Sequence, residues 1–368
     1  MQKPDSRLPL LDYCRFAAAV SVLSFHYFWN GIANRKITSM DHVDALTSWA
    51  SYGYLGVDLF FMISGYVIFL SARRRTTSQF VVGRATRIYP AYLVAMLVTA
   101  AFACWLGVGE TSVTLKQVVG NVLFYQPLHR QRFVDGVYWT LMYEVRFYFA
   151  VAVLIAVGAQ KHFDRVFKLW PALMLLAVLA GPGAWMDPER GNWPLLGGYY
   201  AFFASGALFA IVRSAPSVTG CLALATSTAL GLRYALALTG AQADTTQFAA
   251  TALLLLSFTA VFFAINWSAD RRELVLPLAA TLGALTYPLY LVHAHIGYML
   301  LSRFGSNEYR VPAYGLTIAF VFAVAWAIHE LVEVRFARAW KSLFEAGAGL
   351  VERRWSRLRT YVWREAPR

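Results

Sequence analysis

The sequence is poor in charge. Charged residues make up 14% of its 368 residues, while hydrophobic residues make up 58% and aromatic residues 16%. A soluble domain carries about 25% charged residues. Long apolar runs take the place of the missing charge, and runs of about 20 apolar residues span a bilayer as helices. The composition therefore indicates one integral membrane domain, although length alone would suggest two soluble domains.

Cysteine is also scarce. Cys14, Cys104 and Cys221 each lie in or at an apolar run, far from one another in the sequence. Their spacing fits neither a metal site nor a disulfide framework. We expect them to be small buried hydrophobic residues, and we expect no bound metal.

Acidic residues are fewer than basic ones, which gives a formal net charge of +13. The basic residues lie in short loops and in the C-terminal tail, and no basic soluble module is present that could bind a nucleic acid backbone. The excess of basic residues in alternate loops instead indicates a membrane protein with both termini in the cytoplasm. We therefore expect membrane lipids, and no nucleic acid, among its partners.

Apolar runs predict an all-α fold, a polytopic bundle of about ten transmembrane helices, because backbone in lipid must satisfy its own hydrogen bonds. The predicted spans are 8–28, 54–71, 88–106, 138–157, 167–184, 196–212, 217–238, 247–267, 278–301 and 311–334. We expect residues 1–340 to form the integral domain in a bacterial inner (cytoplasmic) membrane. Residues 341–368 alternate basic and aromatic side chains, which predicts an amphipathic helix on the cytoplasmic leaflet.

Polar residues inside the spans are the best indicators of function, because charge in a bilayer is costly. Arg15 and His26 lie eleven residues apart in the first span, so a helix places them within about 20° of the same face and about 16 Å apart. Histidine in a polar cavity is a natural general base. The alternative for His26 is a packing histidine near the membrane interface.

The third span begins with Arg84 and Arg87, which are neighbours on a helix because they lie three residues apart. Two guanidinium groups at the mouth of a bundle could bind phosphate. The simpler alternative is a pair of membrane-edge arginines that follow the charge rule.

Glu144 lies well inside the apolar fourth span, which begins near Trp139. A buried carboxylate needs a partner or a proton. Arg15 or Arg146 could pair with it, or it could polarise His26. The alternative is a purely structural role.

The ninth span carries Tyr287, Tyr290 and His293 at intervals of three, so these side chains crowd one side of a helix. An interfacial aromatic belt is the alternative. In the second span, Asp58 and Ser64 are polar, and Asp58 could simply be solvated. We include the tyrosines, His293, Asp58, Ser64 and Trp139 among residues expected to line a substrate site.

Together these segments resemble the acyltransferase-3 family of integral membrane O-acyltransferases. Arg15 and His26 match its arginine and histidine with ten residues between them. Four further segments resemble its signatures in matching order: GVDLFFMISGYVI, FVVGRATRIYPAY, YWTLMYEVRFY and TYPLYLVHAHI. The last has Thr286 where the family commonly has serine, which still offers a hydroxyl.

The resemblance implies transfer of an acyl group, commonly acetyl from acetyl-coenzyme A, to a hydroxyl of an extracytoplasmic glycan or lipid-linked glycan. It implies that His26 is the catalytic base, that Arg15 orients or stabilises the site, and that Arg84 and Arg87 hold coenzyme A phosphates. Glu144 and His293 would line the site.

Two other classes compete with this interpretation. A transporter of a glycan or small solute would also bury His, Arg and Glu, but it would more often show related halves and broken helix pairs, which the sequence lacks. A non-catalytic scaffold would not explain why polar residues recur at helical spacing inside so many spans. Direct attack on the acyl donor is expected, since no activated Ser or Cys motif is evident.

Overall fold

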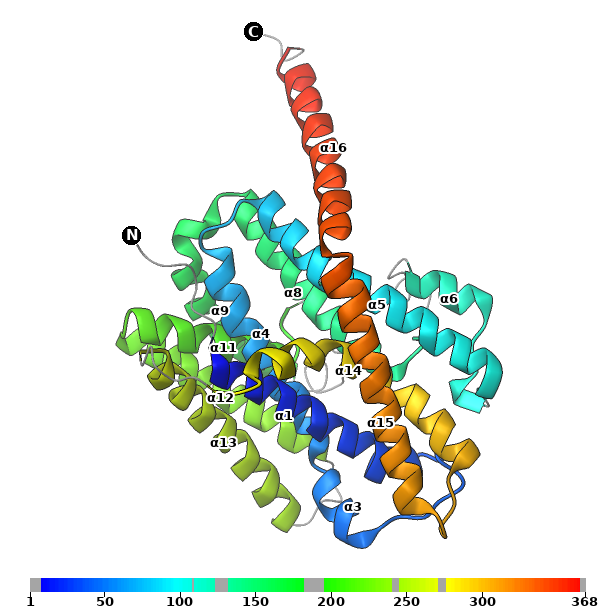
Figure 1. The fold of residues 1–368 in the computed structure, drawn as a ribbon. Coiled ribbons are helices and arrows are strands. Elements are labelled where there is room, and N and C mark those ends of the chain that lie inside the picture. Colours follow the sequence, from blue (N-terminus) through cyan, green and yellow to red (C-terminus); the bar gives the residue numbers. More distant parts are fainter. Residues whose placement is uncertain are drawn as a thin grey trace.

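The structure, a computed structural model, describes residues 8–107, 109–122, 132–181, 195–239, 245–270 and 276–364. These residues form a bundle of helices (Figure 1), and no strand occurs in any of the described ranges. The all-α class is therefore confirmed.

Every predicted span contains a helix. The main helices are α1 (Pro9–Phe25), α4 (Gly56–Ala72), α5 (Thr77–Leu106), α8 (Trp139–Ala156), α9 (Phe163–Ala180), α11 (Tyr200–Ser214), α12 (Val218–Thr239), α13 (Thr245–Asp270), α14 (Ala279–Phe304), α15 (Arg310–Ile328) and α16 (Ala337–Arg364). Two π-helical turns continue α1 and α15, namely η1 (His26–Asn30) and η6 (His329–Arg335). Short elements fill the connections: α2 (Gly31–Ala33), α3 (Asp44–Ala50), η2 (Gly53–Leu55), η3 (Gly109–Thr111), α6 (Leu115–Val122), η4 (Gly136–Tyr138) and η5 (Ala159–His162).

One boundary differs clearly from the prediction. Helix α5 begins at Thr77, well before the predicted start at residue 88. Thr76 caps it, accepting a hydrogen bond from the backbone N–H of Gln79 while the Gln79 side chain accepts one from the backbone N–H of Thr76. The hydropathy pattern missed these first turns because they are polar and extend beyond the apolar run.

Six stretches in the described part of the chain are long and apolar enough to cross a membrane: Asp44–Ala72, Thr77–Leu106, Gly136–Ala156, Val218–Thr239, Thr245–Trp267 and Arg310–Arg335. Helices α11 and α14 are not among them, although they are heavily buried. Helix α11 is apolar but has only 15 residues, whereas α14 is long enough but carries polar residues such as His293 and His295, which a helix surrounded by other helices rather than lipid can hold. The count of about ten crossing helices and the N-in/C-in orientation stay predictions.

Helices α4 and α11 pack closely at the centre through two glycines. A Cβ atom at Gly65 would collide with the backbone oxygen of Phe203, and one at Gly206 would collide with that of Met62. The peripheral helices expose apolar side chains outward, as expected where lipid surrounds a protein. This explains why Cys104 and Cys221 are exposed and only Cys14 is partly buried. The prediction of three buried cysteines was wrong for two of them, because apolar character in such a bundle does not imply burial in protein.

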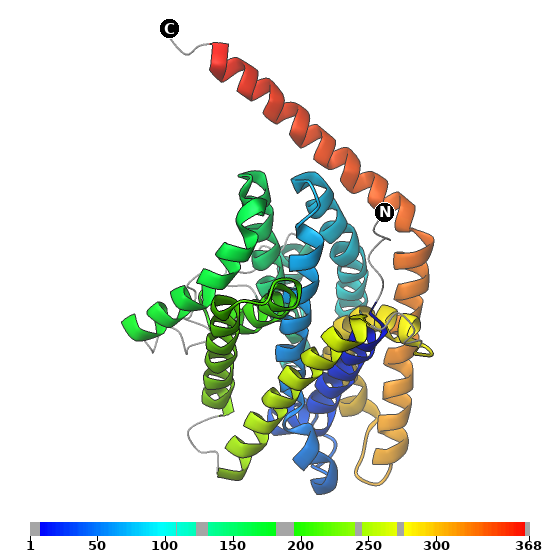
Figure 2. The same cartoon turned by 90° about the vertical axis from the view of Figure 1, so that its left-hand side faces the viewer.

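One end of the bundle gathers the features that matter for function. Helix α5 begins there, and α15 passes through η6 into α16 on the same side; α1 and α14 begin part-way along the bundle, and their first turns meet α5, η6 and α16 around one cavity. Figure 2 shows α16 leaving the bundle as a long helix that extends beyond it. We call this the α16 end, and the opposite end, where α1 runs into η1 and α8 begins, the far end.

Candidate active site

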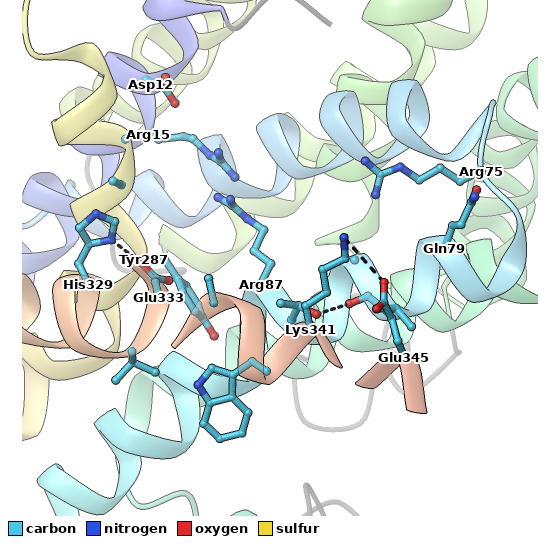
Figure 3. Close-up of a pocket in the computed structure, with 18 of the residues that line it drawn as sticks. Asp12, Arg15, Arg75, Gln79, Arg87, Tyr287, His329, Glu333, Lys341 and Glu345 are labelled. Carbon is cyan, nitrogen blue, oxygen red and sulfur yellow. Dashed lines mark hydrogen bonds and ion pairs between the residues drawn. The ribbon is translucent and has the colours of Figure 1, made fainter. Parts of the chain in front are cut away.

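A cavity of about 920 Å³ opens at the α16 end, and we call it the mouth cavity. The first turns of α1, α5 and α14 form its walls together with η6 and α16 (Figure 3). Basic side chains outnumber acidic ones. The basic lining residues are Arg15, Arg75, Arg87 and Lys341, and the acidic ones are Asp12, Glu333 and Glu345. The excess is one residue, so it is the adjacent guanidinium groups of Arg15 and Arg87, rather than the lining as a whole, that favour an anionic ligand.

Arg15 and Arg87 come from different helices, and their guanidinium groups point toward one another across the cavity (Figure 3). Two adjacent positive charges repel, so the arrangement is stable only where negative charge is close. The Glu144 carboxylate acts on Arg15 electrostatically, together with Asp12. An anionic group bound between the two arginines would relieve the remaining repulsion.

Arg84 lies elsewhere. Its guanidinium packs over the rings of Phe80, at 5.8 Å, and Tyr148, at 6.0 Å, and donates a hydrogen bond of 3.4 Å to the Ser71 hydroxyl. Its Nε is buried without a hydrogen-bond partner. The structure therefore separates the two arginines that the sequence brings together: Arg87 lines the mouth cavity, whereas Arg84 faces α4 and α8.

A smaller cavity of about 80 Å³ continues inward, and we call it the inner cavity. Arg15, Arg87 and Tyr287 line both cavities, so they form the passage between them. Deeper in, Glu144 and Tyr290 line the inner cavity. The two cavities form a continuous route from the α16 end toward the middle of the bundle.

Ser64 and Glu144 meet beside this route. The Ser64 hydroxyl, on α4, is 4% exposed and donates a hydrogen bond of 2.8 Å to the Glu144 carboxylate on α8. This bond fixes the orientation of the carboxylate, because it satisfies one of its oxygens inside an apolar bundle. The Glu144 carboxyl group is thus held in a fixed orientation beside the cavity that Arg15 also lines.

The three residues of α14 lie at successive depths along the route. Tyr287 stands at the passage and donates a hydrogen bond of 3.0 Å to the Ile88 carbonyl. Tyr290 lines the inner cavity, with its hydroxyl 2.9 Å from that of Thr140. His293 lies one step further, with its ring centroid 5.6 Å from that of Tyr290. Because they are spaced three residues apart on α14, these side chains form a row that runs from the passage toward the middle of the bundle.

His26 and His293 face each other at the end of that row, with ring centroids 5.1 Å apart. The Nδ1 of His293 lies 2.9 Å from the Tyr290 carbonyl, which can only accept, so Nδ1 carries the proton and Nε2 carries a lone pair. That Nε2 is buried without a hydrogen-bond partner. The His26 Nδ1 contacts the Tyr298 hydroxyl closely and the Asn30 amide at 3.4 Å. The pair therefore offers a fixed lone pair that could accept a proton.

His26 belongs to the π-helical turn η1, directly after α1 ends. Such single π turns are frequent at functional sites. Neither the mouth cavity nor the inner cavity includes His26 in its described lining, whereas Arg15 lines both. Arg15 and His26 therefore do not share one cavity. The side chains of Tyr290 and His293 lie between the inner cavity, which Arg15 lines, and His26.

Four of the six expected lining residues lie outside the described lining of both cavities: Ser64 and His293, which lie beside the route, and Trp139 and Asp58. Trp139 packs in an aromatic cluster with Phe61, Tyr143 and Tyr199, at ring-centroid distances of 5.0 to 6.5 Å. Asp58 is 3% exposed, so it is buried rather than solvated. Trp139 supports the wall of the inner cavity through Phe61, which lines it.

Several residues at the site do not stand out in the sequence. Arg75 reaches the mouth cavity because Gly83 leaves room for it: a Cβ there would lie 2.7 Å from the Arg75 guanidinium. Asp135 is fully buried and accepts hydrogen bonds from the backbone N–H groups of Val137, at 3.1 Å, and His295, at 2.9 Å. The signal for Asp135 was its place just before a helical turn, where aspartate commonly caps.

A third cavity, of about 420 Å³, lies at the far end, and we call it the outer cavity. Its lining is Phe25, Trp29, Ser51, Tyr52, Tyr54, Leu238, Thr239 and Gln247. The Phe25 ring lies 5.3 Å from the His26 ring, centroid to centroid. The histidine pair therefore lies between the inner cavity and the outer cavity. Over the described residues, no cluster of three or more His, Cys, Asp or Glu side chains could hold a metal ion.

Comparison with known proteins decides the family. The acyltransferase-3 family, whose description is "Acyltransferase domain", matches residues 8–330. The chain belongs to this family. It is an acyltransferase, and its apolar helices are those of a multi-pass membrane protein.

Two curated relatives are similar over part of their length. The exopolysaccharide production protein ExoZ of Rhizobium meliloti is 28% identical over 251 residues, which cover 66% of this chain and 75% of ExoZ. YrhL of Bacillus subtilis, whose name proposes a peptidoglycan O-acetyltransferase, is 26% identical over 212 residues, which cover 50% of this chain and 30% of YrhL. In a comparison with solved structures, none matched significantly.

Proposed function

We propose that this acyltransferase moves an acetyl group from acetyl-coenzyme A to a hydroxyl of a cell-surface or exported glycan. The observation that carries the proposal is the route from a basic cavity, past Glu144 and the α14 tyrosines, to the histidine pair. The names of both relatives concern extracellular polymers, a polysaccharide in one case and peptidoglycan in the other. We place the protein in the bacterial inner membrane, with the α16 end in the cytoplasm.

The donor enters the mouth cavity. Its phosphates lie near Arg87 and Arg75, since arginine forks match phosphate oxygens well. Negative charge there offsets the repulsion between Arg15 and Arg87. Arg84, which the sequence pairs with Arg87, would act indirectly by holding Tyr148, a residue of the inner cavity.

The thioester then reaches past Tyr287 into the inner cavity. The acceptor hydroxyl attacks the thioester carbonyl as the imidazole pair takes its proton, so a C–O bond forms and the C–S bond breaks. The proton passes to the leaving thiolate of coenzyme A. Arg15, whose guanidinium lies beside that of Arg87 at the passage, orients the donor there rather than contacting the reacting carbonyl. The transfer is direct, without an acyl-enzyme.

The acceptor approaches from the far end, through the outer cavity. Trp29 and Tyr52 offer aromatic faces, and Gln247 and Thr239 offer hydrogen-bonding groups, a combination suited to sugar rings. Donor and acceptor thus reach the histidine pair from opposite sides. A transporter, the alternative considered above, is disfavoured by membership of an acyltransferase family.

Mass spectrometry of cell-surface glycans tests this function. We expect glycans from cells with the wild-type protein to carry acetyl groups that are absent from cells without it. Cells with His26→Ala, at equal protein levels in the membrane, should match the cells without the protein. Identical glycans in all three strains would refute the proposed activity.

A further inference from the structure

The first turns of α16 form one wall of the mouth cavity. Ala337, Trp340, Lys341 and Glu345 all line it, and Figure 3 shows Lys341 pointing into the space beside Arg87. The family match ends at residue 330, so this wall lies outside the shared acyltransferase domain. Sequence alone also places residues from 341 onward in a separate tail. The first turns of α16 therefore complete the cavity, although neither the family match nor the sequence pattern assigns them a role in the site.

The α16 wall is anchored to the bundle. The ring of Trp340 stacks with that of Phe344, at 6.4 Å between centroids and 25° between planes. Phe344 in turn contacts the ring of Tyr89 on α5 at 6.2 Å. These contacts hold the Trp340 ring at the cavity rather than leaving it free on a mobile tail.

The direction of the route decides which end of the donor meets α16. Arg15, Arg87 and Tyr287 line both cavities, whereas the described lining of the inner cavity includes no residue of α16. The acyl end must point inward, toward the histidine pair. The nucleotide end must therefore remain at the mouth, where α16 and Arg75 form the walls.

We propose that α16 supplies the subsite for the adenosine 3′-phosphate end of the acyl donor. Trp340 stacks against the adenine ring, and Lys341, with Arg75 opposite, binds the 3′-phosphate. Lys341 pairs at 3.7 Å with Glu345, another residue of the cavity lining, and both side chains are more than half exposed to solvent, so the contact is weak enough to exchange for a phosphate. This inference rests on the proposed function, because it assumes that coenzyme A occupies the mouth cavity.

Binding of coenzyme A and of 3′-dephospho-coenzyme A to the full-length protein in lipid nanodiscs tests the subsite. We expect Trp340→Ala to weaken both ligands about five- to 150-fold, the range for loss of one stacked base. Trp340→Phe should restore most of the affinity, which separates stacking from a collapse of α16. Lys341→Ala should weaken coenzyme A about tenfold and leave 3′-dephospho-coenzyme A unchanged.

Arg338→Ala is the matched control, because Arg338 is an exposed basic residue of the same helix that lies outside the cavity lining. It should leave both affinities unchanged. Equal loss in Arg338→Ala and Lys341→Ala would overturn the inference in favour of a general charge effect at the membrane surface. If the α16 variants bind normally while Arg87→Ala does not, only the α16 inference fails. If the wild type binds no coenzyme A, the proposed donor fails with it.

Discussion

A single hydrogen bond determines which ring nitrogen of His293 can accept a proton. Because its Nδ1 donates to the Tyr290 carbonyl at 2.9 Å, the other ring nitrogen is left as a buried lone pair beside the His26 ring. The sequence indicates that a histidine lies on the same side of α14 as two tyrosines. It cannot indicate which nitrogen is protonated, since that depends on how the ring meets the backbone one turn earlier.

Removing His293 should therefore impair chemistry rather than donor binding. We expect His293→Ala to lower kcat roughly 10²- to 10⁴-fold, the usual worth of a general base, with the dissociation constant for coenzyme A unchanged. Radiolabelled acetyl transfer and equilibrium binding measure the two effects. His162→Ala, at an exposed histidine between α8 and α9, is the control and should behave as wild type. A weaker coenzyme A complex with normal kcat would contradict this role.

The two arginines of α5 should differ when each is replaced. Arg87→Ala should weaken coenzyme A binding by about tenfold or more, because Arg87 lines the mouth cavity. Arg84→Ala should leave that binding intact and lower the free energy of unfolding by about 1 kcal/mol, since it loses contacts with the Phe80 and Tyr148 rings. Binding assays and thermal unfolding in detergent measure both. Equal loss of binding in the two variants would instead support the hypothesis from the sequence that Arg84 and Arg87 bind the phosphates together.

At the scale of helices, the divergence of Arg84 and Arg87 has a geometric cause. Residues three apart on a helix are separated by about 60° around its axis, which is enough for them to face different neighbours. The sequence locates the helices well, because apolar runs mark them. It does not reveal which neighbour each face meets, and so it groups residues that the bundle separates.

The contact between α4 and α11 gives a stability prediction. Gly206→Ala should lower the free energy of unfolding by about 1–3 kcal/mol, because the new methyl group would collide with the Met62 backbone and force the helices apart. Gly315→Ala is the control, since no atom lies within 4 Å of a Cβ at that position of α15. It should be neutral or slightly stabilising. Thermal unfolding in detergent distinguishes them, and equal effects would contradict the close packing.

The sequence predicts that α16 is a helix but not that it lines the mouth cavity. Its alternation of basic and aromatic residues predicts an amphipathic helix, and a helix is present. The same pattern gives no sign that Trp340 and Lys341 reach a cavity, because that depends on how η6 directs α16 across the start of α5. Its position on a membrane leaflet stays a prediction.

For the whole molecule, the account requires two ends with different roles and different sides of the membrane. The uneven distribution of basic residues predicts that the α16 end lies on the cytoplasmic side of the membrane. The loop after α14 should then lie on the extracytoplasmic side. Asn307→Cys, in that loop, should react with a membrane-impermeant maleimide in right-side-out vesicles. Ala215→Cys, in the loop between α11 and α12, should react only in inside-out vesicles. Both positions are exposed. The reverse pattern would invert the proposed paths of donor and acceptor.

The family and the class of reaction could be predicted from ordered motifs, whereas the route through the molecule could not. The motifs specify which residue types occur, but the separation of the mouth, inner and outer cavities arises from packing among helices distant in sequence. Arg75 and Tyr298 belong to the site for this reason, although neither stood out in its own segment.

The central claim is that the acyl end of the donor reaches the inner cavity from the α16 end. Photo-crosslinking with an acyl-coenzyme A that carries a diazirine on its acyl chain, followed by peptide mass spectrometry, tests it most directly. The account predicts labelling of peptides that contain Phe60, Thr140 or Tyr290, suppressed by excess acetyl-coenzyme A. Labelling confined to the peripheral helices α12 and α13, or labelling that acetyl-coenzyme A does not suppress, would contradict it.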